Sequence, residues 1–338
     1  MKAALFEKPH HLTVTQKTLR SLRNDELMIG VSACGVCGTD LHIVEGSSRS
    51  TPPVILGHEY AGIITDVGHD VRNYSVGEAV AVDPNISCGT CFYCRRGEVH
   101  LCENLRALGV DVDGGMAESC IVPTSQVYRL PKSLSPEKAA FVEPLSCVVH
   151  GIDRARIRSG DNVVVLGGGT VGLLVLQLAR ISGAARVIVV EPLEWKRAIA
   201  AKVGADTVLD PAKTDVAEFI HDTTRVGADV VIECVGKADT VALALELARR
   251  GGTVELFGVC PLGTKLPFEP NSVYFKELTI VGSYLNPHTF DRSIALLAEN
   301  KVVIDHFATQ RYPLDGVHEA LTSLREGKTI KSLIVPGL

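Results

Sequence analysis

NVVVLGGGTVG, the stretch at residues 162–172, joins a short apolar run to three consecutive glycines. The apolar run predicts a buried strand over 162–166, and the residues from Thr170 onward predict a helix. Glycines spaced as Gly-x-Gly-x-x-Gly let a pyrophosphate approach the backbone, where the free N–H groups of a helix N-terminus bind it. A flexible turn would explain the glycines alone, but the flanking strand and helix favour a dinucleotide site. We expect the cofactor to contact Gly167, Gly169, Thr170, Val171 and Gly172.

An acidic residue, Glu191, ends the next predicted strand, about 20 residues after the last glycine of the motif. At this position a carboxylate accepts hydrogen bonds from the adenosine ribose hydroxyls and repels a 2′-phosphate. The sequence therefore favours NAD over NADP. A solvated acid at a strand end is the alternative, and the nearby Lys196 and Arg197 would weaken the exclusion of the phosphate.

Strands and helices alternate from residue 162 to residue 282. The predicted strands are 162–166, 186–190, 207–209, 230–233, 253–257 and 278–282, and the predicted helices between them are 170–182, 194–203, 215–223 and 240–248. This alternation predicts a doubly wound parallel sheet of the Rossmann type. Leu278 to Gly282 would be its edge strand.

The first part of the chain, to about residue 145, is rich in short apolar runs separated by Gly, Pro, Asn and Asp. The runs 26–31, 61–64 and 79–82 predict strands of a barrel-like domain, and 136–150 predicts one or two helices. A helix at 290–299 and a strand near 330–335 end the chain. We therefore expect an α/β protein with two domains. The first, at 1–150 and 284–338, is β-rich and catalytic, and the second, at 151–283, binds the dinucleotide.

Composition restricts the possible partners. The 338 residues include 46% hydrophobic and 22% charged residues, with a net charge of -5 and no run of Lys or Arg. Such a chain offers little electrostatic attraction to nucleic acid or to an anionic membrane, and we expect neither as a partner. It also contains no apolar stretch of membrane-spanning length and no signal-peptide pattern at its N-terminus. Ten clustered cysteines favour metal binding in a reducing cytoplasm.

Four of these cysteines have the spacing C-x2-C-x2-C-x7-C, at Cys88, Cys91, Cys94 and Cys102. Four thiolates on one loop predict a closed tetrahedral zinc site, which stabilises a lobe but offers no position for substrate. An iron–sulfur cluster is the alternative. The long last gap, with Glu103 after Cys102, argues against the ferredoxin pattern.

A second group of metal-binding residue types is dispersed along the first domain. Cys34 and Cys37 form another Cys-x-x-Cys, and His58, Glu59 and Glu143 follow in two later segments. One thiolate, one imidazole and two carboxylates would form an open catalytic zinc site, if the fold brings them together. A redox-active cysteine pair and a surface histidine are the alternatives for the separate motifs.

The chain resembles the zinc-containing medium-chain dehydrogenases, and among them the sorbitol dehydrogenase-like polyol dehydrogenases. The resemblance covers essentially the whole chain. It is based on the glycine motif, the four-cysteine loop and five further motifs: Cys-Gly-Thr-Asp-Leu-His at 37–42, Gly-His-Glu at 57–59, Asp-Gly-Gly-Met-Ala-Glu at 113–118, Glu-Pro-Leu-Ser at 143–146 and Glu-Cys-Val-Gly at 233–236.

The resemblance implies two zinc ions per chain and a set of roles. Cys37, His58 and Glu59 would bind the catalytic zinc, and Glu143 would bind it directly or through a water. Cys34 would be a bystander. Thr39 and His42 match the family's proton relay from the substrate through the nicotinamide ribose to solvent.

Lys196 matches a family position that contacts the adenosine ribose. The resemblance further implies a homodimer or homotetramer that pairs through the edge strand 278–282, and a cytoplasmic enzyme that oxidises a polyol or another secondary alcohol to the ketone with NAD.

Two departures leave the substrate open. Ser146 is followed by Cys147 and Val148 where the polyol branch has a glycine after Ser-Val, and 284–287 reads Tyr-Leu-Asn-Pro where sorbitol enzymes carry an Arg-Tyr pair. Butanediol, threonine and simple secondary-alcohol dehydrogenases share the motifs above. A non-catalytic sensor of NAD and zinc is the alternative outside enzymes.

Overall fold

A computed structural model describes residues 1–266, 269–307 and 309–338. By its internal contacts the chain forms two compact units. The first unit comprises Met1–Pro144, Pro287–Asn300 and Ala308–Leu338, and the second comprises Leu145–Asn286 and Lys301–Phe307. The boundary predicted at residue 150 falls inside the helix α3 (Val142–Ala155), and 301–307 group with the second unit rather than the first.

A parallel sheet forms the centre of the second unit, with the strand order β13-β12-β11-β14-β15-β16. Its strands are β11 (Asn162–Leu166), β12 (Arg186–Val190), β13 (Thr207–Leu209), β14 (Ala228–Glu233), β15 (Ala248–Leu256) and β16 (Thr279–Gly282). The order reverses between β11 and β14, as in a doubly wound sheet. The Rossmann-type fold predicted from the sequence is confirmed.

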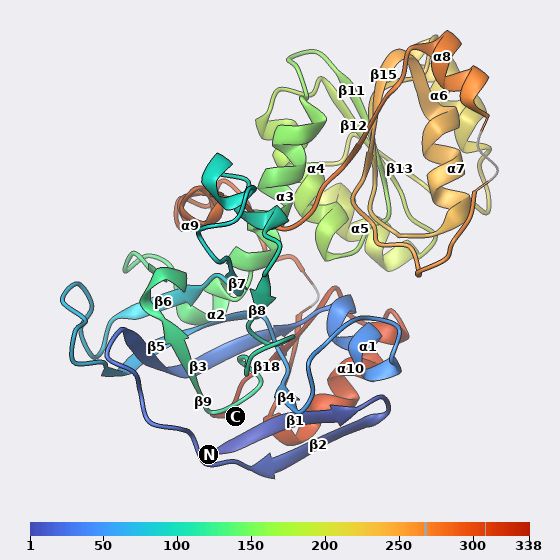
Figure 1. Cartoon of the computed structure of the whole chain (residues 1–338). Helices are drawn as coiled ribbons and strands as arrows, with labels where there is room; N and C mark the ends of the chain where they lie inside the picture. The colour runs from blue at the N-terminus through green and yellow to red at the C-terminus, as the bar shows by residue number, and fades with distance from the viewer. Residues whose placement is uncertain (267–268, 308) are drawn as a thin grey trace. The chain divides into compact units, whose positions relative to one another are not determined.

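Helices cover both faces of this sheet. They are α4 (Thr170–Ile181), α5 (Glu194–Lys202), α6 (Val216–Thr224), α7 (Ala238–Leu247) and α8 (Pro270–Lys276). Because parallel crossovers are right-handed, α4 and α5 pack on one face and α6 and α7 on the other (Figure 1). The sheet is buried between them, and for this reason its strands are continuous apolar runs such as Val163–Leu166 and Val187–Val190.

Mainly antiparallel strands form the core of the first unit, although β17 and β18 of the main sheet pair in parallel. The longest sheet has the order β10-β6-β5-β3-β18-β17, and β9 also pairs with β3. Its strands are β3 (Glu26–Val36), β5 (Glu59–Val67), β6 (Ala79–Val82), β9 (Ser119–Pro123), β10 (Val127–Arg129), β17 (Thr309–Tyr312) and β18 (Lys331–Ile334). The last strand pairs with β3, so the end of the chain completes the domain that the N-terminus begins.

Smaller elements surround this sheet. The strands β1 (Lys2–Lys8), β2 (His11–Gln16) and β4 (Val54–Ile55) form a second sheet, and β7 (Asn85–Ile86) pairs with β8 (Arg106–Ala107). The helices are α1 (Gly38–Glu45), α2 (Pro136–Ala139), the first turn of α3, α9 (Phe290–Ala298) and α10 (Val317–Arg325). Among the described residues no helix is both long and apolar enough to cross a membrane.

The predicted elements differ from the observed ones mainly at their ends. The run 26–31 is only the first half of β3, and β5 begins at Glu59 rather than at residue 61. Pairing of β3 with β5 extends both strands toward the polar motifs, because Gly35 lies opposite Glu59. Ala248, predicted as the end of a helix, begins β15.

Candidate functional site

Three residues of the first unit bring potential metal ligands together. The ligand atoms of Cys37, His58 and Glu59 all lie within 4.8 Å of one another. Cys37 directly precedes α1, and its backbone N–H donates to the Asp40 carboxylate at 2.9 Å, which fixes the turn. The three residues meet because β3, which leads into Cys37, pairs with β5, which begins at Glu59.

Two glycines leave room for buried side chains in and beside this group. At Gly57, φ is +93°, and a Cβ would lie 2.5 Å from the Cys34 sulfur. At Gly35, a Cβ would lie 2.1 Å from a carboxylate oxygen of Glu59. Any larger side chain at either position would therefore displace the loop or the carboxylate. Cys34 itself is fully buried and lies outside the group.

The electrostatic field at Cys37, His58 and Glu59 favours a bound cation. Burial lowers the pKa of His58, but the charges and hydrogen bonds of Asp40 and Cys37 outweigh it and raise the pKa well above its usual range. Nδ1 of His58 lies 3.6 Å from the Asp40 carboxylate, and both residues are buried. A carboxylate beside one imidazole nitrogen is the common support of a metal-binding histidine. The donor set and its surroundings fit a zinc ion.

Two further buried charges border the group. Glu143, in the first turn of α3, is buried, and burial raises its pKa to about 7 against the opposing charge of His58. Its carboxylate lies outside the set of atoms within 4.8 Å of one another. Lys331, the first residue of β18, forms an ion pair with Glu59, and both side chains are almost inaccessible to solvent.

The two residues of the expected proton relay lie on α1. The Thr39 hydroxyl is 3.7 Å from the Cys37 sulfur. His42, one turn later, is exposed, and its Nδ1 lies 3.3 Å from the Ser47 hydroxyl. The helix therefore leads from the thiol to solvent.

Sequence reasoning assigned no role to Asp40 or Lys331. Asp40 lies within the quoted motif at 37–42, so its proximity could have suggested a supporting role. Lys331 has no local signal, because only the pairing of β18 with β3 brings it to Glu59.

The four-cysteine loop forms a second group, in which all four sulfur atoms lie within 4.8 Å of one another. The sulfur of Cys88 accepts the backbone N–H of Cys91 at 3.4 Å, and the sulfur of Cys102 accepts those of Cys88 and Asn104 at 3.2 and 3.3 Å. Hydrogen bonds from the backbone lower the pKa of Cys88 to about 5 and also lower the pKa of Cys91, whereas desolvation and the neighbouring thiols raise the pKa of Cys94 to about 11. None of these cysteines is in a disulfide. Four converging sulfurs with backbone N–H donors beside them fit a closed zinc site.

In the second unit, the glycine turn connects β11 to α4. Gly167 has φ +102°, and a Cβ on Gly172 would lie 1.9 Å from the carbonyl oxygen of Gly167. The helix therefore begins so close to the strand end that only glycine fits at position 172. Gly169 is the residue before the helix, and Thr170 and Val171 form its first turn. Their N–H groups are those that a pyrophosphate would use.

Glu191 lies directly after β12 and is 5% exposed. Its two carboxylate oxygens accept the backbone N–H groups of Gly168 at 2.8 Å and Leu193 at 2.9 Å. The carboxylate is thus held in place beside the glycine turn. The guanidinium of Arg197 forms an ion pair with Asp210, and the ammonium of Lys196 lies 5.5 Å above the Trp195 ring.

Comparison with known families gives two matches. Residues 170–299 match the family described as zinc-binding dehydrogenase, and residues 23–132 match the alcohol dehydrogenase GroES-like domain.

Individual relatives extend over nearly the whole chain. D-arabinitol dehydrogenase 1 of Uromyces fabae is 35% identical over 99% of this chain and 97% of its own length. L-threonine 3-dehydrogenase of Pyrococcus abyssi is 39% identical over 90% of each chain. A solved structure from Sinorhizobium meliloti 1021, assigned to the zinc-binding dehydrogenases and bound to NADP, is 42% identical, covers 99% of each chain and has a TM-score of 0.96.

Proposed function

The chain belongs to the zinc-binding, alcohol dehydrogenase-like family of medium-chain dehydrogenases, and we propose that it oxidises one secondary alcohol of a polyol to the ketone with NAD. The family, the dehydrogenase activity and the use of zinc and a nicotinamide dinucleotide follow from the comparisons. The residues that perform the reaction and the substrate are our proposals. The main observation in support of both is that the ligand atoms of Cys37, His58 and Glu59 lie close together.

We assign the catalytic zinc to these three residues, with Glu143 as a direct ligand or as the partner of a bound water. A zinc ion held there would supply a Lewis acid for the alcohol oxygen, and NAD would supply the hydride acceptor. The chain orients the ligands. Asp40 faces His58 Nδ1, and Lys331 pairs with Glu59. The second zinc would stabilise the loop of Cys88, Cys91, Cys94 and Cys102.

The proton released by the alcohol needs a path to solvent. Thr39 lies beside Cys37 and His42 is exposed one turn later on the same helix, which supports their assignment as a relay. A histidine accepts and releases protons near neutral pH, as this role requires.

Replacement of His58 tests the metal assignment. His58→Ala should lose turnover and one zinc per chain while NADH fluorescence titration still shows binding. His69, an exposed histidine of the same unit, provides the control, and His69→Ala should retain both zinc and turnover. Retention of two zinc ions and full activity by His58→Ala would remove His58 from the site.

For the coenzyme, we propose NAD rather than NADP. The fixed carboxylate of Glu191 supports this, since it would oppose a 2′-phosphate. The relative from Sinorhizobium meliloti is bound to NADP, which makes the test decisive. The ratio of kcat/KM for NAD over NADP should exceed unity and fall in Glu191→Gln. A ratio below unity in the unchanged protein would refute the proposal.

For the substrate, a polyol is the first candidate because the arabinitol dehydrogenase matches the full length of this chain. Threonine, an amino alcohol, is the second candidate, favoured by the higher identity to the threonine dehydrogenase. NADH formation with D-arabinitol, sorbitol, 2,3-butanediol and L-threonine, with and without a chelator, separates the two. Faster turnover of threonine than of any polyol would favour the second candidate.

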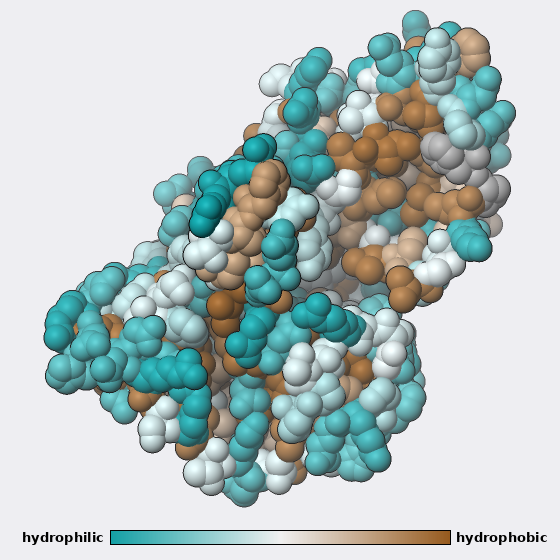
Figure 2. Space-filling model, in the orientation of Figure 1, coloured by the Kyte–Doolittle hydropathy of each residue, from teal (hydrophilic) through white to brown (hydrophobic). Residues whose placement is uncertain are grey.

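We also propose that the chain forms a homo-oligomer in the cytoplasm. The edge strand β16 is largely exposed, and the large apolar side chains of Tyr274, Phe275 and Ile280 near it are exposed as well. Figure 2 shows apolar residues gathered on the surface of the second unit, to which β16 belongs. A second copy pairing at the edge would cover them. Light scattering should give a dimer or tetramer, and Ile280→Lys should reduce its mass. The ten free cysteines support a reducing compartment.

A further inference from the structure

A pocket of about 430 Å³ lies at the edge of the parallel sheet where its strands begin. The glycine motif lies at the other edge, where β11 ends. The pocket is formed entirely by residues of the second unit. Its polar walls include Arg154, Arg156, Arg158 and Arg249, with Thr253 and Thr279. No step of the proposed reaction uses these residues.

Three strands supply the floor of the pocket. Val230 of β14 is in register with Thr253 of β15, which is in register with Thr279 of β16. Residues in register on neighbouring parallel strands point to the same face, so the two hydroxyls lie side by side. Neither hydroxyl hydrogen-bonds to another residue in the part of the chain that the structure describes. Both can therefore donate to a ligand.

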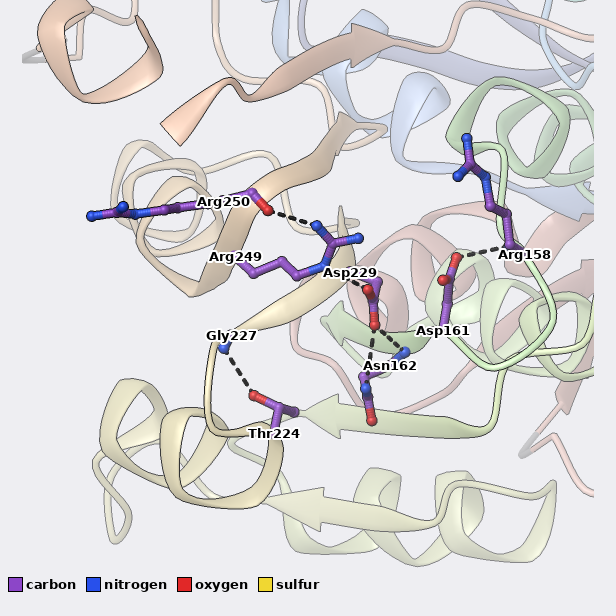
Figure 3. Close-up of polar contacts among 8 residues, drawn as sticks. All are labelled: Arg158, Asp161, Asn162, Thr224, Gly227, Asp229, Arg249 and Arg250. Atoms are coloured by element: carbon purple, nitrogen blue, oxygen red, sulfur yellow. Dashed lines mark hydrogen bonds and ion pairs between the residues drawn. The ribbon is translucent and has the colours of Figure 1, made fainter. Parts of the chain in front are cut away.

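Two of the arginines are anchored through their inner nitrogen. Arg249 Nε donates to the Asp229 carboxylate at 2.6 Å, and Asp229 also accepts the backbone N–H of Asn162 at 2.7 Å (Figure 3). Arg154 Nε donates to the carbonyl oxygen of Gly282. Nη1 of Arg249 also donates to the carbonyl oxygen of Arg250 at 2.6 Å. Anchoring in this way fixes the guanidinium and leaves Nη2 of Arg249 and the terminal nitrogens of Arg154 for a ligand.

The charge balance of the pocket favours an anion. Arg156 and Arg158 have no ion-pair partner among residues 1–266, 269–307 and 309–338. Asp153, Asp161 and Asp229 also line the pocket, so the four arginines leave an excess of one positive charge. Asp229 and Asp161 are held in place by the backbone N–H groups of Asn162 and Arg158. Four guanidiniums in one pocket contrast with a chain whose net charge is -5.

We propose that this pocket binds a small phosphorylated metabolite through its phosphate group. The planar fork of arginine matches phosphate oxygens, and hydroxyls beside it complete such sites. The volume suits a small organic ligand. Val230 and Val281 provide an apolar wall for the carbon part of the ligand. The site is separate from the dinucleotide turn, so both can be filled at once.

Calorimetric titration of the zinc-loaded protein with ribose 5-phosphate tests the proposal, with NADH at saturation to fill the dinucleotide site. The unchanged protein should bind one equivalent per chain, and inorganic phosphate should compete. The double variant Arg156→Gln/Arg158→Gln alters two exposed side chains and should weaken binding by about tenfold or more.

Arg250→Gln provides the matched control, because Arg250 neighbours Arg249 but its side chain extends away from the Asp229 network (Figure 3). It should change the affinity by less than about twofold. Absence of saturable binding, or equal affinities of the double variant and Arg250→Gln, would overturn the site. Binding of ribose or citrate as tight as that of ribose 5-phosphate would overturn the assignment to phosphate.

Discussion

Glu255 should make the protein less stable as the pH rises, and Glu255→Gln should remove this dependence. The residue lies on β15 and is fully buried. Neither carboxylate oxygen has a hydrogen-bond partner among the described residues. It faces α3 so closely that a Cβ on Gly151 would lie 2.6 Å from Oε1. Burial raises the pKa of Glu255 to about 8, although the charge of Arg154 lowers it in part.

The sign of the effect follows from proton binding. The folded protein keeps the Glu255 proton up to about pH 8, whereas the unfolded chain loses it near 4.5. Between these values the unfolded state binds fewer protons, so the free energy of unfolding falls as pH rises. In this range the free energy of unfolding falls by about 1.4 kcal/mol per pH unit. Relative to its value at low pH, it is lower by roughly 1 kcal/mol at pH 5 and by roughly 3 kcal/mol at pH 7.

The amide of Glu255→Gln has no proton to lose in this range. The difference in unfolding free energy between the variant and the unchanged protein should therefore grow in favour of the variant by about 3 kcal/mol from pH 5 to pH 8. Urea unfolding followed by circular dichroism at each pH, with zinc present throughout, measures it. Glu246→Gln removes a carboxylate from an exposed position on α7. Its free energy of unfolding should change with pH in the same way as that of the unchanged protein. A difference for Glu255→Gln that stays constant with pH would refute the reasoning.

Three further predictions concern the two metal groups and the glycine turn. Gly172→Ala places a Cβ 1.9 Å from the Gly167 carbonyl oxygen, so the turn must open and the Kd for NADH, measured by fluorescence, should rise by about tenfold or more; an unchanged Kd would contradict this. Cys88→Ser should reduce zinc from two to one per chain by metal analysis and lower the Tm by several degrees, since the loop loses its metal. In protein stripped of zinc, Lys331→Met leaves the buried Glu59 carboxylate without its cation and should cost about 3–5 kcal/mol in urea unfolding, whereas a loss below about 1 kcal/mol would show that the pair contributes little.

Local sequence patterns predicted most of the fold and the glycine turn at 167–172. The glycines of 167–172 required a strand before them and a helix after them, and both are present at the predicted positions. The four-cysteine loop is also local, because its ligands lie within 15 residues of sequence and their spacing alone brings the sulfurs together. Physical constraints of this kind act between neighbours in the chain, so they can be recognised without coordinates.

The surroundings of the proposed zinc ligands Cys37, His58 and Glu59 were decided only by the tertiary structure. The pairing of β3 with β5 brings Glu59 opposite Gly35, and the pairing of β18 with β3 brings Lys331 to the same carboxylate from the far end of the chain. The arginine pocket likewise depends on the register of three strands. Long-range strand pairing determines which partner each buried charge contacts. These partners are far apart in the sequence, so no local spacing predicts the contact.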